Sequence, residues 1–167
     1  MTIAGSLVSS PLDVGKTPID AYIREHLGRL TRVARALLSR ATDVEPTLEE
    51  VVGALRGRDV SDGDVFGELR RACAAREARS GRGLATVTMP SADAPTTARE
   101  GAAAGAIAAR QLLGRLTPTE REAVILHQIG GLSRRELAVA CGVDEATVMA
   151  RVGRGLLALG VSKTEEG

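Results

Sequence analysis

The chain has 167 residues, of which 44% are hydrophobic, so it can form two modest cores but is too short for a large enzyme fold. Its formal net charge is +1, which gives no indication of a membrane-binding surface. No apolar run approaches the roughly 20 residues that span a bilayer and no signal-peptide pattern opens the chain, so we expect a cytoplasmic protein without a membrane segment.

A long helix is predicted to begin near Thr17, after 16 residues that we expect to be disordered. Its apolar side chains recur at the i, i+3 and i+4 spacing of a helix that faces a core. They are Ile23, Leu27, Leu30, Val33, Ala34, Leu37 and Leu38. A shorter helix is predicted to begin at Thr47, with Glu50 as its capping partner, and a third covers about residues 64–79.

The loop before the third helix is acidic, because Asp59, Asp62 and Asp64 stand against one nearby arginine. Carboxylates repel the phosphates of nucleic acid. The chain has one Tyr and one Phe, and we interpret both Tyr22 and Phe66 as core or rim residues of these helices.

Residues 81–97 are rich in Gly, Ser, Thr and Pro and are predicted to be a flexible linker. The linker would join a helical domain at 17–80 to a second one at 98–161, which a disordered tail follows at 162–167. The alanine-rich run at 102–109 is predicted to be the first helix of the second domain. Since no segment alternates apolar and polar residues, we expect an all-α fold of two small helical domains.

The second domain carries two successive helix starts. Thr117 with Glu120 is predicted to form a capping box, and the glycines at 130–131 end the helix that it opens. Ser133 with Glu136 repeats the capping box directly afterwards and predicts a second, shorter helix.

A third helix follows a short turn. Gly142, Val143 and Asp144 match the turn that joins the two helices of a helix-turn-helix at a steep angle, with Asp144 as the cap of the recognition helix. The side of that helix predicted to face the core carries Val148, Val152, Leu156 and Leu159. The side expected to face a DNA major groove carries Glu145, Thr147, Met149, Arg151 and Arg154.

This segment resembles the C-terminal domain of bacterial RNA polymerase sigma factors of the extracytoplasmic-function (ECF) group. The matching residues are Leu116-Thr117-Pro118, Glu120-Arg121-Glu122, Gly131-Leu132-Ser133, Glu136-Leu137-Ala138, Gly142-Val143, Thr147-Val148, Arg151 and Arg154. LuxR-type regulators share the opening pattern, but the two recognition-helix arginines and the absence of a recognisable receiver or ligand domain upstream favour a sigma factor. Upstream, the acidic residues around 43–50 and the segment VFGELRRACA are similar to the polymerase-binding and promoter-melting helices of the same group.

The resemblance implies two macromolecular partners, RNA polymerase core and promoter DNA, with an anti-sigma factor as a third candidate, and it implies no cofactor and no metal. The DNA-binding residues that it implies are Arg134, Arg135, Glu145, Thr147, Met149, Arg151 and Arg154. The polymerase-binding residues that it implies are Asp43, Glu45, Glu49 and Glu50. The first domain would contact the minus-10 element of the promoter and the second would read the minus-35 element.

Two functions remain open. The chain is either a working ECF-like sigma factor that directs transcription initiation, or a sigma-derived interaction module that binds polymerase, an anti-sigma factor or another regulator without melting promoter DNA. The acidic loop and the lack of Trp favour the second, whereas the well-kept helix-turn-helix favours the first, which is our main hypothesis. An enzyme is not indicated, because no nucleophile elbow, phosphate-binding glycine loop or HExxH motif occurs.

The second domain carries little excess charge, since residues 112–160 have a net charge of +1. Gly153 and Gly155 also interrupt the recognition helix, and two glycines in one helix cost roughly 2 kcal/mol relative to alanine. We therefore predict weak DNA affinity in the absence of polymerase. Cys73 and Cys141 have no His or Cys at metal-site spacing, and we interpret them as small buried hydrophobic residues.

Overall fold

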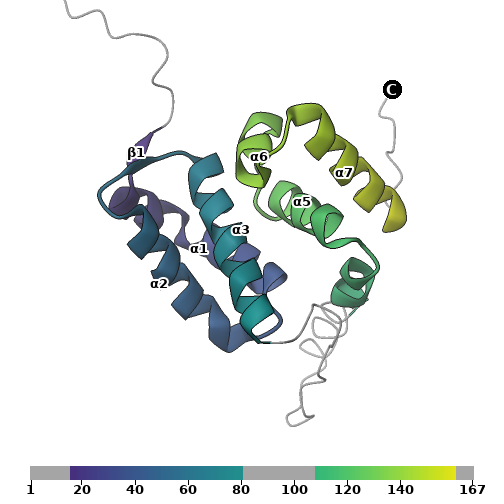
Figure 1. Ribbon diagram of the computed structural model, residues 1–167, viewed down its shortest axis with the longest axis horizontal. Coiled ribbons are helices and arrows are strands. Elements are labelled where there is room, and N and C mark those ends of the chain that lie inside the picture. The colour runs from purple at the N-terminus through teal and green to yellow at the C-terminus, as the bar shows by residue number, and fades with distance from the viewer. Residues whose placement is uncertain (1–15, 81–107, 161–167) are drawn as a thin grey trace, which may run out of the picture.

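The computed structural model describes residues 16–80 and 108–160, which form two helical units (Figure 1). The first unit contains β1 (Thr17–Pro18), α1 (Ile19–Leu37), the 3₁₀ turn η1 (Ala41–Asp43), α2 (Val44–Leu55), β2 (Asp59–Val60) and α3 (Asp62–Arg79). The second unit contains a helical stretch at 108–114, α5 (Pro118–Gln128), α6 (Arg134–Cys141) and α7 (Glu145–Ala158). The predicted all-α fold class is confirmed, with one small addition.

That addition is a two-stranded antiparallel pair at the start of the first unit. Thr17 pairs with Val60 and Pro18 with Asp59, so the predicted loop before α3 is in part a short strand. As a consequence α1 begins at Ile19, later than the sequence predicts, and Pro18 flanks it without a side-chain capping bond.

The core of the first unit lies where α1, α2 and α3 meet. Leu30, Val33, Val51, Phe66 and Leu69 are all almost completely buried there. Tyr22 is also buried, at 4% exposed, so the interpretation of both aromatic residues as core or rim residues is confirmed, and both belong to the core. Leu27 was predicted to face the core but is 48% exposed, because it lies at the edge of the apolar side of α1.

Two predicted helix starts in the first unit were wrong by three residues or fewer. Helix α2 begins at Val44, and Thr47 lies inside it, where its hydroxyl donates to the carbonyl of Asp43 at 2.6 Å. The physical reason is that Pro46 falls in the first turn, where its missing N–H has no helical partner to lose. Helix α3 begins at Asp62, because Ser61 is its N-cap and forms a capping box with Asp64.

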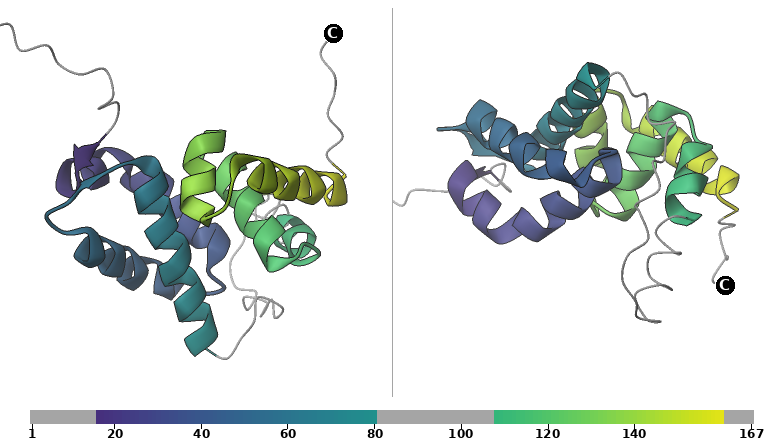
Figure 2. Two further views of the ribbon diagram at one scale, coloured as in Figure 1. Left: turned by 45° about the horizontal axis from the view of Figure 1, so that its top comes forward. Right: turned by 90° about the horizontal axis from the view of Figure 1, so that it is seen from below.

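The two units pack against each other, with α3 alongside α6 and α1 against α5 (Figure 2). Buried side chains of both units belong to one apolar cluster, which reaches from Leu30 and Phe66 in the first unit to Leu126 and Leu137 in the second.

Several predictions about chain organisation concern residues outside the described ranges. These are the disorder of the first 16 residues apart from Lys16, the linker at 81–97, most of the helix at 102–109, and the tail at 162–167. Of that alanine-rich run, residues 108 and 109 are described and are helical. Among the helices of the described ranges, none combines the length and the apolar character that a membrane crossing requires.

Candidate nucleic-acid and polymerase interface

Both predicted capping boxes of the second unit are present and set the directions of α5 and α6. At α5 the Thr117 hydroxyl accepts from the Glu120 amide at 3.4 Å, and the Glu120 carboxylate accepts from the Thr117 amide at 3.3 Å. At α6 the Ser133 hydroxyl accepts from the Glu136 amide at 3.4 Å, and the Glu136 carboxylate accepts in return at 2.8 Å. Each box satisfies amide groups that the first helical turn leaves without partners.

The turn between α6 and α7 has the geometry of a helix-turn-helix. Gly142 adopts φ 66°, a left-handed conformation that favours glycine, and Val143 is half-buried against the core. Asp144 then caps α7, accepting from the amide of Thr147 at 2.8 Å and from its hydroxyl at 2.6 Å. These two hydrogen bonds hold the pKa of Asp144 below its usual value, and the bond from the hydroxyl has the larger effect.

The inner side of α7 is packed on α5 and α6. Val148 and Val152 are buried, as predicted, whereas Leu156 and Leu159 are half-buried. Gly155 is buried against α5, so this glycine is part of the helix contact.

The outer side of α7 presents polar residues to solvent. Glu145, Thr147 and Arg154 are exposed and Arg151 is half-buried. Met149, which was expected to point outward, is half-buried and packs against the core, because the core-facing side of α7 is wider than the valines alone indicate. Arg134 and Arg135 are exposed in the first turn of α6, on the same unit.

One of the candidate DNA-binding arginines has a partner within the protein. The Nε of Arg154 donates to the Oε1 of Glu120 at 3.0 Å, while 62% of the Arg154 side chain stays exposed. Hydrogen bonds from Thr117 and then from Arg154 hold the pKa of Glu120 below its usual value. Arg154 is therefore directed along α5 and keeps its two terminal nitrogens available.

The four candidate polymerase-binding carboxylates divide into two kinds. Asp43 lies 3.9 Å and Glu50 3.3 Å from the guanidinium of Arg76, so α3 holds both of them in place. Glu45 and Glu49 are exposed and form no ion pair with any described residue. Only this second pair is free to meet a cationic partner without breaking an internal contact.

Arg121, whose structural role no sequence pattern indicates, fixes the helical stretch before the helix-turn-helix. Its side chain is 6% exposed and donates to the carbonyls of Leu113 at 2.8 Å and Leu116 at 3.1 Å. Burial lowers the pKa of this guanidinium. In the sequence Arg121 directly follows Glu120, the last residue of the capping box, and that position does not indicate burial.

The prediction of a buried cysteine is confirmed for Cys73 but not for Cys141, which is only half-buried. Cys73 is buried and its pKa is raised to about 12, first by burial and then by the nearby Glu77. Cys141 is half-buried, and burial raises its pKa as well. Within the described ranges no group of three or more His, Cys, Asp or Glu side chains is arranged to hold a metal ion.

Comparison with known proteins agrees with this geometry. Residues 106–159 match the family model described as Sigma-70, region 4. No curated protein matches the sequence. The fold is similar to that of CnrH, solved in complex with the cytosolic domain of CnrY, with a TM-score of 0.63 and 20% identity over 85% of this chain and 84% of that chain.

A second similar structure is the sigma factor RpoE in complex with the anti-sigma factor NepR from Bartonella quintana. The TM-score is 0.57 and the identity 18%, over 88% of this chain and 99% of that chain. Both matches cover more of the chain than either helical unit alone, so the shared fold includes both units. Residues 106–159 therefore match the sigma-70 region 4 family, and the two helical units together share the fold of these two solved proteins.

Proposed function

We propose that this protein binds core RNA polymerase in the cytoplasm and directs it to promoters, with the first unit near the minus-10 element and the second unit at the minus-35 element. The observation that supports this most is the helix-turn-helix of α6 and α7. Its recognition helix packs on its own unit through one side and leaves Glu145 and Thr147 exposed on the other. A helix presented in this way fits a DNA major groove.

The cationic residues of the second unit have distinct roles in this proposal. Arg134 and Arg135 lie at the N-terminal end of α6, where free amides and the helix dipole also favour anions, and they would contact backbone phosphates. Arg151 and Arg154 would contact phosphates or base edges from α7. Glu145, Thr147 and Met149 would influence which sequence is read; for Met149 this is an indirect effect, since it packs beneath the outer side of the helix.

The polymerase contact is proposed for the acidic residues of η1 and α2. Glu45 and Glu49 would meet cationic groups of polymerase directly, and Asp43 and Glu50 would add to the same negative surface while paired with Arg76. Because residues 112–160 have a net charge of only +1, DNA affinity without polymerase should be weak. Polymerase would supply the remaining interface.

A second candidate function is a sigma-derived module that binds regulators without melting DNA, and one observation favours it. The chain has no Trp, and its single Tyr and single Phe are both buried, so no aromatic side chain is exposed to stack on a flipped base. Such stacking is worth about 1–3 kcal/mol per base. Promoter opening would therefore depend on other side chains of α3 or on polymerase itself.

An anti-sigma protein is a further proposed partner. One similar structure holds a sigma factor together with an anti-sigma factor, and the match covers 99% of that sigma factor's chain. We infer that the same kind of partner binds this chain.

Transcription in vitro separates the two candidates. Purified protein is added to core polymerase with fragmented genomic DNA of the source bacterium as template, and new transcript starts are mapped. We expect discrete starts that share a minus-35 element. Stable binding to core without any transcript would overturn the sigma-factor proposal and favour the interaction module.

A further inference from the structure

One carboxylate joins the start of α5 to the recognition helix α7. The Oε2 of Glu120 accepts from the amide of Thr117 at 3.3 Å and so completes the capping box of α5. The Oε1 of the same side chain accepts from the Nε of Arg154 at 3.0 Å. The two oxygens therefore serve two different helices, and only the first contact is needed to cap α5.

Close packing of α7 on α5 makes this contact possible. Gly155 follows Arg154 on α7 and is buried against α5. A Cβ at position 155 would lie 3.5 Å from the carbonyl oxygen of Glu120, so α7 passes directly beside the first turn of α5. The backbone approach at Gly155 thus brings the Arg154 side chain within reach of the Glu120 carboxylate.

The two paired side chains differ in exposure. The Glu120 side chain is 17% exposed, whereas the Arg154 side chain is 62% exposed. The pair therefore has a largely buried acceptor and a donor that extends into solvent. Among the described residues, only the Nε of the Arg154 guanidinium has a hydrogen-bond partner. Its Nη1 and Nη2 are left for the bidentate hydrogen bonds that arginine forms with phosphate.

Fixing one nitrogen of a guanidinium restricts the whole side chain. Ordering a long, freely rotating side chain on binding weakens affinity by about 2-fold to 10-fold. Arg154 has given up part of that freedom before any partner arrives, because its Nε is bound to Glu120. A partner at its terminal nitrogens therefore meets a guanidinium that is already oriented.

We infer that Glu120 is a positioning residue for DNA binding, which acts by directing the terminal nitrogens of Arg154 at a backbone phosphate. The inference rests on the proposed function, which places α7 in the DNA major groove. A phosphate is the expected partner because Arg154 lies in the second half of α7, whereas the N-terminal residues of a recognition helix contact base edges. Glu120 itself does not contact DNA, since phosphates repel a carboxylate.

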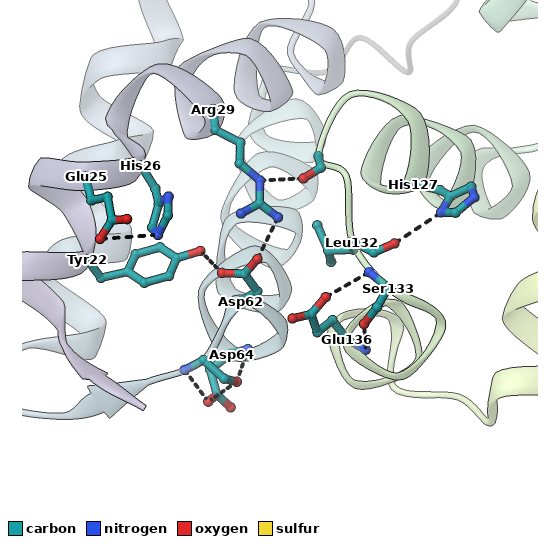
Figure 3. Close-up of polar contacts among 12 residues, drawn as sticks. Tyr22, Glu25, His26, Arg29, Asp62, Asp64, His127, Leu132, Ser133 and Glu136 are labelled. Carbon is teal, nitrogen blue, oxygen red and sulfur yellow. Dashed lines mark hydrogen bonds and ion pairs between the residues drawn. The ribbon is translucent and has the colours of Figure 1, made fainter. Parts of the chain in front are cut away.

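The substitutions Glu120→Gln and Glu136→Gln form a matched pair. Glutamine keeps one side-chain oxygen, which is sufficient for a capping box but cannot accept from Thr117 and Arg154 together. Glu136 has the same capping role on α6, where its carboxylate accepts from the amide of Ser133 at 2.8 Å (Figure 3). It has no arginine partner among the described residues, so Glu136→Gln removes the same charge without disturbing a positioned guanidinium.

Titration of promoter DNA with the protein bound to core polymerase measures the effect of each variant. We expect Glu120→Gln to bind promoter DNA about 2-fold to 10-fold more weakly than Glu136→Gln. In an Arg154→Ala background the two substitutions should have the same effect, because Glu120 then has no arginine to position. Equal affinities of the two variants with Arg154 present, or a difference that persists without it, would overturn the inference.

Two further measurements separate orientation of the side chain from loss of structure. In NMR spectra, the Nε–H signal of Arg154 should be protected from exchange in the original protein and in Glu136→Gln, and should lose this protection in Glu120→Gln. Arg154→Lys tests the same contact from its other partner, since lysine keeps the charge but lacks the planar guanidinium. Adding Glu120→Gln to Arg154→Lys should not weaken DNA binding further, and a further loss would contradict the inference.

The proposed function can fail separately. If the original protein with polymerase binds promoter DNA no better than DNA without a promoter, the sigma-factor proposal is contradicted. If it prefers the promoter but the two glutamine variants bind alike, only the inference about Glu120 fails. The Nε–H signal reports in both cases whether the contact between Glu120 and Arg154 exists in solution.

Discussion

Gly155 of α7 lies directly against Val124 of α5: a Cβ at position 155 would fall 2.5 Å from the Cγ2 of Val124. From the sequence alone, this glycine is expected only to destabilise the recognition helix. The structure assigns it a packing role, because the two helices could not approach this closely with any larger residue. Gly153, two residues earlier, has nothing within 4 Å and has no such role.

Alanine substitutions at these two glycines should therefore have opposite effects on the free energy of unfolding. Gly153→Ala should stabilise the protein by about 0.5–1 kcal/mol, since alanine is the better helix former. Gly155→Ala should destabilise it by about 1–2 kcal/mol, because overpacking exceeds the same gain in helix propensity. Urea denaturation measures both, and equal stability of the two variants would contradict the packing role.

The cap of α3 predicts a dependence of stability on pH. Hydrogen bonds from Ser61 hold the pKa of Asp64 below its usual value, so the contribution of this carboxylate is present above the unfolded pKa near 3.9 and is lost as pH falls through the lower folded pKa. Below pH 4 the difference in stability between the original protein and Asp64→Asn should shrink. Ser61→Ala should cost about 1 kcal/mol at neutral pH. A pH-independent difference would refute this assignment.

Sequence patterns predicted the contacts between residues that are close together in the sequence, and they missed the contacts that depend on tertiary packing. The capping boxes at Thr117 and Ser133 are contacts over three residues, so short patterns were sufficient to find them. Arg121, by contrast, is buried under the end of a neighbouring helix, a position that only the folded chain defines.

The interunit contact was missed for the same reason. Gly63 and Gly67 have the four-residue spacing of a close helix approach, but their partner α6 is about 70 residues further along the chain. Arg29 and Arg70 likewise acquire their partners through tertiary packing. The predicted start of α2 at Thr47 is three residues late, because Pro46 is tolerated in the first turn of the helix.

The two thiols should differ in reactivity in the folded protein. Cys73 has a pKa raised to about 12, so at pH 8 roughly one molecule in ten thousand carries the reactive thiolate. Cys141 is half-buried and should react with iodoacetamide first. Mass spectrometry of timed samples at pH 8 gives the order of modification, and urea should make the two rates equal. Earlier modification of Cys73 in the folded protein would contradict its burial.

Charge reversal should separate the two kinds of acidic residue in η1 and α2. Glu45→Lys with Glu49→Lys should weaken binding to core polymerase and leave thermal stability nearly unchanged, because neither residue has an internal ion pair among the described residues. Asp43→Lys with Glu50→Lys has the same charge change but also places two cations beside Arg76, so it should lower stability as well. Fluorescence anisotropy measures the affinity for core polymerase, and thermal unfolding measures stability. Unchanged polymerase affinity in the first variant would show that Glu45 and Glu49 are not part of the interface.

Neutralising the arginines of the recognition helix should weaken the promoter complex and reduce its dependence on salt. If Arg151 and Arg154 both contact phosphates, Arg151→Ala with Arg154→Ala should lower the slope of log affinity against log salt concentration by about 2. Arg32→Ala with Arg35→Ala is the matched control, since it removes the same charge from exposed positions of α1. Titration of promoter DNA with the polymerase complex at several salt concentrations gives the slopes. Equal slopes for the two variants would show that Arg151 and Arg154 do not contact the phosphates. If these arginines contact base edges instead, Arg151→Ala with Arg154→Ala should reduce the preference for the promoter sequence.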